Sequence, residues 1–320
     1  MPDYKEVANN TLYRGLNRRD FLKYQIKALF CMAIGSTGLI VPKSGLAEAK
    51  PDIAVVKGTP KEAVRAAIGI MGGMGEFVKP GNRVLIKPNM SFPNPPEMAT
   101  TTHPEVVREI ALLCKEAGAS KVMIMDYPLF SSKDCLEKNG IFDACNDIKD
   151  VSVAMVTSGR LFEKTDFPGA EIMPENGVLK EALKADVLIA SPVAKSHSST
   201  GISLSMKGMM GLVWERGGMH SKGLSPSIVD MCSVLKADLT IIDATRVLST
   251  RGPRGPGNVL IGNTIIASRD MVAADAFTVS NFEWYGRRYK PRQVQHILLA
   301  HERGLGRMDI ENLNVKRLVL

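Results

Sequence analysis

The chain has 320 residues, of which 45% are hydrophobic and 6% aromatic, so it can bury one large core or two modest ones. Its formal net charge is +8, from 41 lysines and arginines against 33 aspartates and glutamates that are interleaved along the chain. The few aromatic residues form no stacking pattern, which argues against nucleic acid as a partner. A basic cleft that binds an acidic small molecule fits this composition better.

Residues 1–49 have the order of parts of an export signal. Arg18-Arg19 is followed by Phe-Leu-Lys, by a moderately apolar run at 28–41 that is short for a membrane span, and by Ala47-Glu48-Ala49. This order resembles a twin-arginine signal peptide with cleavage before Lys50. It implies export of the folded chain by the twin-arginine (Tat) translocase to the periplasm or the cell exterior. An uncleaved leader would instead anchor the chain to the membrane, and an ordinary amphipathic helix is the remaining interpretation.

Predicted strands and helices alternate through the rest of the chain. We expect strands at 52–56, 83–86, 121–125, 151–156, 185–190, 239–242, 261–267 and 315–320. We expect helices at 60–71, 104–118, 132–148, 203–214, 226–235, 271–279 and 291–303, and a hairpin or irregular insertion at 159–177. Because many strands lack polar alternation, residues 50–320 are predicted to form an α/β domain. Its sheet would be mostly parallel with helices on both faces, and two lobes around a cleft are a variant of this arrangement.

Polar side chains follow several of the predicted strands directly. Lys87, Asn89, Asp126 and Asp243 each come just after such a strand. Open α/β sheets bind ligands at the carboxyl ends of their strands, so we expect these side chains to meet in one cleft.

Two loops rich in proline add further candidates. The loop at 90–102 leads to His103, which is either the cap of the next helix or a ligand contact. The loop at 251–257 has three glycines and two prolines and carries Arg251 and Arg254. These arginines either clamp a carboxylate or phosphate, or lie in a solvated connector.

Two aspartates belong to the predicted helix at 271–279. Asp270 is expected to cap its N-terminus or, because it also follows the strand predicted at 261–267, to join the cleft as a ligand contact. Asp275 lies further along on the apolar face, where a carboxylate needs a partner, and we expect a lysine of the cleft to supply it.

The stretch from Ser191 to His220 holds the most candidate chemistry. Lys195 and His197 are two positions apart, so in an extended segment they point to the same side. We expect His197 and His220 to face the same cleft, and to serve there in proton transfer or as metal ligands, because they flank the helix predicted between them.

Lys207 lies within the predicted helix at 203–214, among methionines and glycines. Glycine is costly inside a helix, so Gly208 and Gly211 indicate that another backbone or a ligand packs very close. A poorly hydrated lysine has a lowered pKa and is a candidate nucleophile or anion anchor. The alternative is a methionine-rich core helix whose lysine extends to water.

The five cysteines of the chain include no C-x-x-C pair. An iron–sulfur cluster or zinc finger held by this chain alone is therefore not expected. Cys135 and Cys145 would form a disulfide in an oxidising compartment, or else are two unrelated buried thiols.

Taken together, these motifs resemble a bacterial and archaeal family catalogued as domain-of-unknown-function family 362. The segments that carry the resemblance are Lys87-Pro88-Asn89, Thr102-His103-Pro104, Lys195-Ser196-His197, Lys207-Gly208-Met209-Met210-Gly211, His220, Asp243, Gly252-Pro253 and Ser268-Arg269-Asp270. The resemblance covers nearly all of 50–320. Relatives often carry fused ferredoxin modules, which implies anaerobic redox settings and a redox partner protein for a chain without such a module.

A second resemblance is to the lactate racemases, which use a nickel–pincer nucleotide. In that family a histidine, a lysine that tethers the cofactor and a metal-binding histidine occur in order within a glycine-rich stretch. His197, Lys207 and His220 have the same order. The resemblance implies a metal held by the two histidines, or a nucleotide cofactor of the nickel–pincer type.

Two functions follow from these observations. In the first, the chain is an exported enzyme whose Lys195, Lys207 and loop arginines bind an acidic substrate or cofactor. Its two cleft histidines would then transfer protons or bind metal, with Asp243 orienting one of them. In the second, a non-catalytic ligand-binding or redox-accessory protein uses the same cleft. Substrate turnover, or a metal or chromophore bound after purification, distinguishes the two.

Overall fold

The computed structural model describes residues 50–320. The predicted twin-arginine signal at 1–49 lies outside the described residues. Residues 50–320 form one compact unit, so the variant with two lobes is not confirmed. No helix within this described range is long and apolar enough to cross a membrane.

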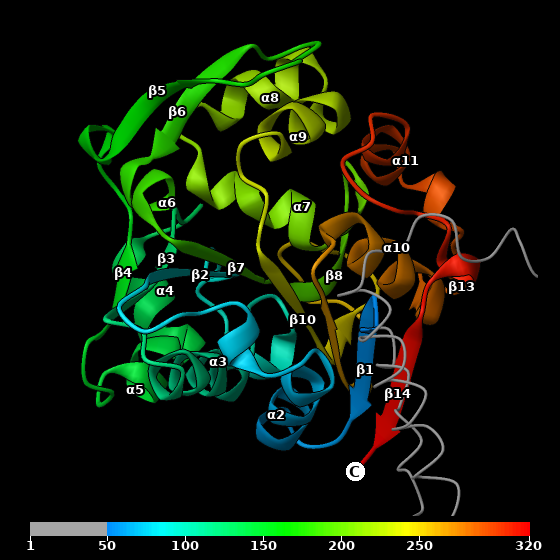
Figure 1. Ribbon diagram of the computed structural model, residues 1–320. Coiled ribbons are helices and arrows are strands. Elements are labelled where there is room, and N and C mark those ends of the chain that lie inside the picture. Colours follow the sequence, from blue (N-terminus) through cyan, green and yellow to red (C-terminus); the bar gives the residue numbers. More distant parts are fainter. Residues whose placement is uncertain (1–49) are drawn as a thin grey trace, which may run out of the picture. The chain divides into compact units, whose positions relative to one another are not determined.

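A ten-stranded sheet runs through the centre of the molecule (Figure 1). Its main path follows the order β14 (Val315–Val319), β1 (Ile53–Lys57), β11 (Val259–Ser268), β10 (Leu239–Leu248), β7 (Val187–Ser191), β2 (Arg83–Pro88), β3 (Lys121–Asp126) and β4 (Val151–Met155). Off this path, β8 pairs with β10 and with β9, and these two strands are Val193–His197 and Gly201–Ser203. Neighbours from β10 to β4 are parallel, whereas β11 is antiparallel to both of its neighbours. The predicted mostly parallel sheet is confirmed.

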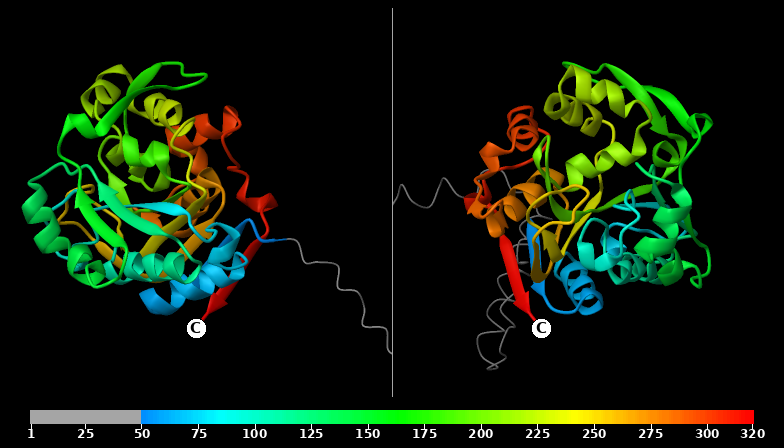
Figure 2. Two further views of the ribbon diagram at one scale, coloured as in Figure 1. Left: turned by 60° about the vertical axis from the view of Figure 1, so that its left-hand side comes forward. Right: turned by 180° about the vertical axis from the view of Figure 1, so that it is seen from behind.

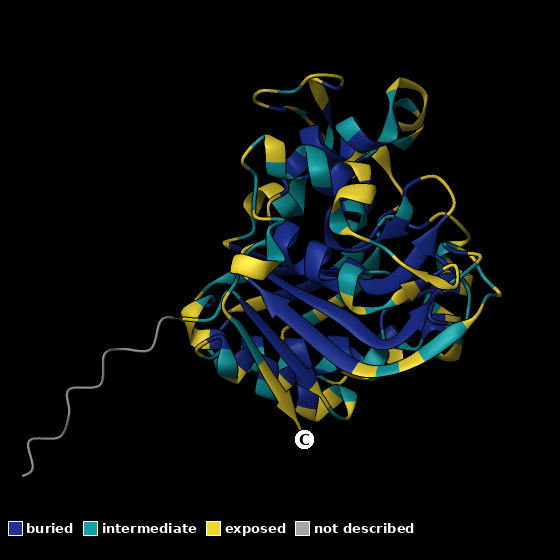
Figure 3. Cartoon of the chain, turned by 90° about the vertical axis from the view of Figure 1, so that its right-hand side faces the viewer, coloured by how far each residue is buried: buried dark blue, intermediate teal, exposed yellow. Residues whose placement is uncertain are grey.

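Helices cover both faces of this sheet, as predicted (Figures 1 and 2). One face carries α2 (Pro60–Ile70), α3 (Pro104–Glu116), α4 (Ser132–Asn139) and α5 (Ile141–Cys145). The other carries α7 (Ser205–Gly208), α8 (Arg216–Lys222), α9 (Leu224–Cys232), α10 (Met271–Asn281) and α11 (Gln295–Glu302). Alternation along β2 divides the core between the faces, since Val84 and Ile86 pack toward α2 and α3 while Leu85 packs on the opposite side. The central strands are accordingly buried along their length (Figure 3).

Smaller elements complete the described chain. The insertion at 159–177 contains one arm of a hairpin of β5 (Phe162–Asp166) and β6 (Glu175–Leu179), which is followed by α6 (Lys180–Lys184). A second small hairpin consists of β12 (Glu283–Trp284) and β13 (Arg287–Arg288).

Three predicted elements differ from the structure. The single helix expected at 132–148 is divided into α4 and α5 at Gly140, whose φ of 73° is left-handed and ends the first helix. The helix expected at 203–214 is the short α7, continued by a 3₁₀ helix at Met209–Leu212. The strand expected at 239–242 continues to Leu248 as β10, so Asp243 lies inside a strand and not at its end.

The four cysteines of the described range are free and buried, so Cys135 and Cys145 are unrelated thiols. Burial raises the pKa of Cys135 to about 11 and that of Cys145 to about 12. Neither thiol is therefore a reactive thiolate near neutral pH.

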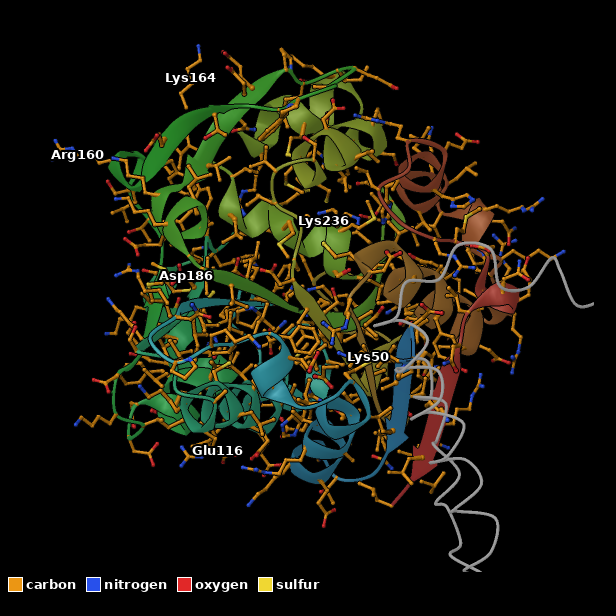
Figure 4. The ribbon with its side chains drawn as sticks, in the orientation of Figure 1. Lys50, Glu116, Arg160, Lys164, Asp186 and Lys236 are labelled. Atoms are coloured by element: carbon orange, nitrogen blue, oxygen red, sulfur yellow. The ribbon has the colours of Figure 1, made fainter. Side chains whose placement is uncertain are left out.

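Charged side chains point outward around the molecule, as the labelled Glu116 and Lys164 do on opposite sides of it (Figure 4). The exceptions include Lys87, Asp126 and Lys195, which are 3%, 0% and 1% exposed. Buried charges need specific partners, and these three residues lead to the candidate site.

Candidate functional site

A cavity of about 820 Å³ lies at the carboxyl ends of β2 and β3, beside β8, α7 and the start of α8. Its charged lining comprises the cations Lys87, Lys195, Lys207, Arg216, Arg251 and Arg254 and the carboxylates Asp126 and Glu215. Asn89, His197 and His220 also line it. Six cations against two carboxylates give a positively charged cavity, which suits an acidic ligand.

Lys87 and Asp126 form a buried ion pair at the floor of the cavity. They come from the neighbouring strands β2 and β3, and their Nζ and Oδ1 atoms are 2.9 Å apart. The other carboxylate oxygen accepts the backbone N–H of Met90 at 2.8 Å and the hydroxyl of Ser91 at 3.0 Å. Burial lowers the pKa of Lys87, and Asp126 opposes that shift. The pair therefore fixes the start of the loop at 90–102 to the sheet.

Gly211 is required by this ion pair. A Cβ atom built on Gly211 would overlap Asp126 Oδ1 and Lys87 Cε and would lie 2.8 Å from Lys87 Nζ. The expected close approach therefore exists at Gly211, although side chains make it, not a backbone or ligand. At Gly208 the expectation is wrong, because the nearest atom, Pro192 Cβ, would be 3.7 Å away, which is ordinary contact.

Lys195 is also buried, and its contacts join the two ends of the loop at 90–102. Its ammonium group donates to Asn89 Oδ1 at 2.8 Å and to the Thr100 carbonyl at 2.7 Å, and it lies 4.5 Å from the centre of the Phe92 ring. Burial, with the positive charge of Lys207 next, holds the pKa of Lys195 well below its usual range. Lys195 thus positions the loop as well as lining the cavity.

The two candidate histidines line the same cavity, as expected from their positions around the glycine-bearing segment. His197 is 7% exposed, and burial, Lys207 and Lys195 lower its pKa to about 3, so its ring is neutral. His220 on α8 is exposed. Partial desolvation, followed by the charges of Lys207 and Arg216, lowers its pKa as well.

Lys207 is partly buried at the third position of α7, and its side chain makes no ion pair or hydrogen bond with any other residue of the described range. Burial, then the positive charges of Arg216 and Lys87, lowers its pKa to about 8, while Asp126 opposes the shift. Its amine is therefore partly unprotonated near neutral pH, and it is available to a ligand. The lysine does not simply extend into bulk water from a core helix.

The two aspartates of the helix predicted at 271–279 have partners other than a lysine of the cavity. Asp270 caps the first turn of α10. Asp275 is fully buried, and accepts the backbone N–H of Ser205 at 2.9 Å, its hydroxyl at 2.5 Å, and the N–H of Met206 at 3.0 Å. Burial raises the pKa of Asp275 to about 7 despite these bonds. The prediction of a lysine partner for Asp275 is wrong, although its contacts fix the start of the helix that carries Lys207.

Asp243 and His103 lie outside the cavity lining and contact one another. Asp243 accepts the backbone N–H of His103 at 2.8 Å, the Thr245 hydroxyl at 2.5 Å and Arg246 at 3.1 Å. The His103 ring caps α3 by accepting the N–H of Glu105 at 3.2 Å, which decides between its two predicted roles. Asp243 therefore anchors a loop, and it orients neither cavity histidine through a hydrogen bond.

The loop at 251–257 brings its two arginines to the cavity. The Gly252 N–H donates to Ser196 Oγ at 2.9 Å, and a Cβ at this glycine would overlap the Ser196 carbonyl, so the loop lies directly on β8. Arg251 has a left-handed φ of 55°, which is uncommon for a residue with a side chain. Arg254 lies over the Phe130 ring at 5.2 Å. The loop therefore forms a wall of the cavity, while Arg251 and Arg254 themselves are exposed.

An aromatic wall with a bound arginine was not predicted. Trp214 stacks on Tyr127 at 5.1 Å, and both rings contact Phe162. Arg216 lies 3.7 Å from the centre of the Tyr127 ring and donates to the carbonyls of Tyr127 and Pro128 at 2.9 and 3.1 Å. Two features of the sequence could have indicated this wall. Tyr127 lies two positions after the strand predicted at 121–125, and Trp214-Glu215-Arg216 follows at the end of the helix predicted at 203–214.

The cavity does not fit a metal bound through its two histidines. No group of three or more His, Cys, Asp or Glu residues in the described range could hold a metal ion. His197 Nδ1 accepts the N–H groups of Ser199 and Thr200, whereas a metal-bound histidine donates its second nitrogen to an acceptor. The expected metal site is therefore not supported by these donors.

Comparisons with known proteins place the whole cavity inside one family. Residues 84–280 match the family described as a domain of unknown function (DUF362), and every lining residue lies in that range. A protein of Synechocystis sp. described as thylakoid-associated is 31% identical over 222 residues, which cover 67% of each chain.

Two solved structures are similar at lower levels. The lactate racemase apoprotein of Thermoanaerobacterium thermosaccharolyticum is 14% identical with a TM-score of 0.41, over 60% of this chain and 51% of that one. A protein of Thermotoga maritima is 12% identical with a TM-score of 0.46, over 77% of this chain and 60% of that one. The chain thus spans about half to three fifths of these solved chains. From its match over residues 84–280, the chain belongs to the DUF362 family.

Proposed function

We propose that this chain is an enzyme that binds an acidic small molecule, as substrate or cofactor, in the positively charged cavity. Lys207 acts on the bound molecule by proton transfer or as a nucleophile. The observation that carries this proposal is the Lys207 amine, which lines the cavity without any partner in the described range. A lysine with a pKa near 8 supplies both an ammonium acid and an amine base near neutral pH.

The distribution of charge partners supports an acidic ligand. Lys87 is paired with Asp126, and the remaining contacts of Lys195 and Arg216 are to neutral oxygens of the protein. Lys207 and the arginines of the loop at 251–257 have no carboxylate partner among the described residues. Of these, Lys207 is partly buried, and because a partly desolvated cation without a counter-charge is unfavourable, an anion bound beside Lys207 would stabilise this arrangement.

Reductive labelling of Lys207 tests the proposal. Pyridoxal 5′-phosphate, which is anionic and forms imines with unprotonated amines, would be trapped on the full chain with borohydride and mapped by peptide mass spectrometry. We expect labelling of Lys207 to rise with pH, with its midpoint near the pKa of about 8, and to level off about one pH unit higher, because the neutral amine is the reacting form. Inorganic phosphate should protect Lys207 but not the exposed Lys236 (Figure 4).

The Lys207→Met variant supplies the control, since it should lose this labelling and the binding of phosphate while remaining folded. Lys207→Arg should restore little function, because a guanidinium is bulkier and stays protonated. Labelling of Lys207 at the rate of Lys236, without protection by phosphate, would contradict the proposal. Phosphate binding without turnover of any anionic substrate would instead identify a ligand-binding protein.

We also propose that the chain is exported by the Tat translocase and that its mature form begins at Lys50. The twin arginines and the Ala47-Glu48-Ala49 sequence support this proposal. Replacing Arg18 and Arg19 by lysine should leave the precursor inside the cell, as measured by fractionation and immunoblotting. Export at the original level would count against it.

A further inference from the structure

The ring of His197 is held in one orientation by the turn that follows β8. Its Nδ1 atom accepts the backbone N–H of Ser199 at 3.1 Å and that of Thr200 at 3.4 Å. A nitrogen that accepts a hydrogen bond in a neutral imidazole carries no proton. The proton of the neutral ring is therefore on Nε2.

The Nε2–H group has no partner among residues 50–320. His197 is 93% buried and lines the cavity, and within residues 50–320 no group forms a hydrogen bond with Nε2. Nε2 is not one of the fully buried, unpaired polar atoms of this range, so it is accessible from the cavity and can donate to water or to a ligand there. Burial first, and then the positive charges of Lys207 and Lys195, lower the pKa of His197 and so disfavour a positively charged ring.

We propose that His197 is a fixed hydrogen-bond donor, through Nε2–H, to an oxygen of the bound anion, so that the cavity selects carboxylate or phosphoryl oxygens and rejects divalent metal ions at this residue. That the ligand is an anion rests on the proposed function. A metal on Nε2 would move the ring proton to Nδ1, where it would face two N–H groups. The lysines that attract an oxyanion would also repel the metal cation.

Two variants separate the roles of the two ring nitrogens. In His197→Asn the amide oxygen can accept from the turn as Nδ1 does, but no donor reaches the position of Nε2. In His197→Gln the longer amide can place an N–H near Nε2, but the acceptor for the turn is lost. We expect the asparagine variant to keep its thermal stability and to bind inorganic phosphate and oxalate about tenfold or more weakly by calorimetry, since a hydrogen bond to a charged group is removed. The glutamine variant should keep most of its affinity and lose stability.

Two measurements on the unmodified full chain make the test independent of how the variants fold. A long-range ¹H–¹⁵N correlation spectrum should show His197 protonated on Nε2, and titration with Ni²⁺ or Zn²⁺ should leave its signals unshifted. A proton on Nδ1, metal binding that disappears in His197→Asn, or equal anion affinity of native protein and His197→Asn would overturn the inference. If the native chain binds neither phosphate nor oxalate, the proposed function fails, while the tautomer and metal measurements still decide the role of His197.

Discussion

Replacing Asp126 by asparagine is expected to lower the free energy of unfolding by about 4 kcal/mol, because it leaves a buried lysine without its counter-charge. The side chains of Lys87 and Asp126 are 2% and 1% exposed. Asparagine keeps an oxygen for Met90 and Ser91, but it turns an amide N–H₂ toward the Lys87 ammonium group, so that donor faces donor. Urea unfolding of both proteins at one pH measures the difference.

The size of this loss should depend on pH. Burial already lowers the pKa of Lys87, and the opposing charge and hydrogen bond of Asp126 are absent in the variant, so the pKa falls further. At pH values between the lowered pKa of Lys87 in the folded variant and its ordinary pKa in the unfolded chain, the unfolded chain binds more protons than the folded one. The free energy of unfolding of the variant therefore rises with pH in this range. The loss should therefore be smaller at about pH 9 than at about pH 6.

The double variant Lys87→Met/Asp126→Asn tests whether the two residues act as a pair. Without a buried charge to leave unpaired, it should be more stable than Asp126→Asn alone, and the two single losses should not add. Strictly additive losses, or a loss for Asp126→Asn below about 1 kcal/mol, would show that the ion pair does not stabilise the fold.

Gly211→Ala should cost about 3 kcal/mol, because the new methyl group occupies the space of the same ion pair. The Cβ atom would overlap Asp126 Oδ1 and Lys87 Cε, and both belong to buried strand residues that cannot move aside freely. Urea unfolding should show a lower midpoint with an unchanged slope. Because Lys207 precedes Gly211 in the same short segment, labelling of Lys207 should change as well.

Gly208→Ala is the matched control, since it makes the same chemical change three residues away. Its Cβ would meet only Pro192 Cβ at 3.7 Å, and its backbone is helical with φ −60° and ψ −32°. Alanine should therefore be neutral or stabilise the protein by up to about 1 kcal/mol. Equal losses in the two variants would mean that the segment is intolerant of side chains in general and that the ion pair is not the cause.

The cavity residues that could be predicted share one property, which is their position along the chain. Lys87, Asn89 and Asp126 belong to the ends of apolar strands, and parallel strands place those ends at one edge. Lys195 and His197 are alternate residues of an extended segment, so they reach the same side. The local sequence pattern was therefore sufficient to predict that these residues share one cavity.

The fold was predictable to the same extent and for the same reason. Apolar runs without polar alternation predicted the buried parallel strands. The ends of helices and strands were harder to predict, because a single residue can end an element without changing the hydrophobic periodicity. At Gly140, for example, a left-handed backbone divides α4 from α5. The continuation of β10 past Asp243 depends on its pairing with β11, whose partner residues from Thr264 to Val259 come from a separate strand later in the chain.

The roles of the aspartates were decided by tertiary structure. A carboxylate at a strand end or on an apolar helix face can meet a lysine, a metal or a backbone N–H, and the sequence does not say which. Asp275 meets the N–H groups of Ser205 and Met206, some 70 positions away, and Asp243 meets that of His103, 140 positions away. Only the packing of α7 and of the loop at 90–102 supplies those donors.

The sequence by itself determined the α/β fold, the family and most of the cations that line the cavity, because these depend on local periodicity and on residues adjacent in the chain. Tertiary structure alone decided which of those cations remain without a partner. Lys87 and Lys195 are held by groups from other segments, whereas the Lys207 side chain has no partner among residues 50–320, and its pKa is lowered by burial and by neighbouring positive charges. Charge pairing and desolvation depend on distances between segments far apart in the sequence, and only the folded chain fixes those distances.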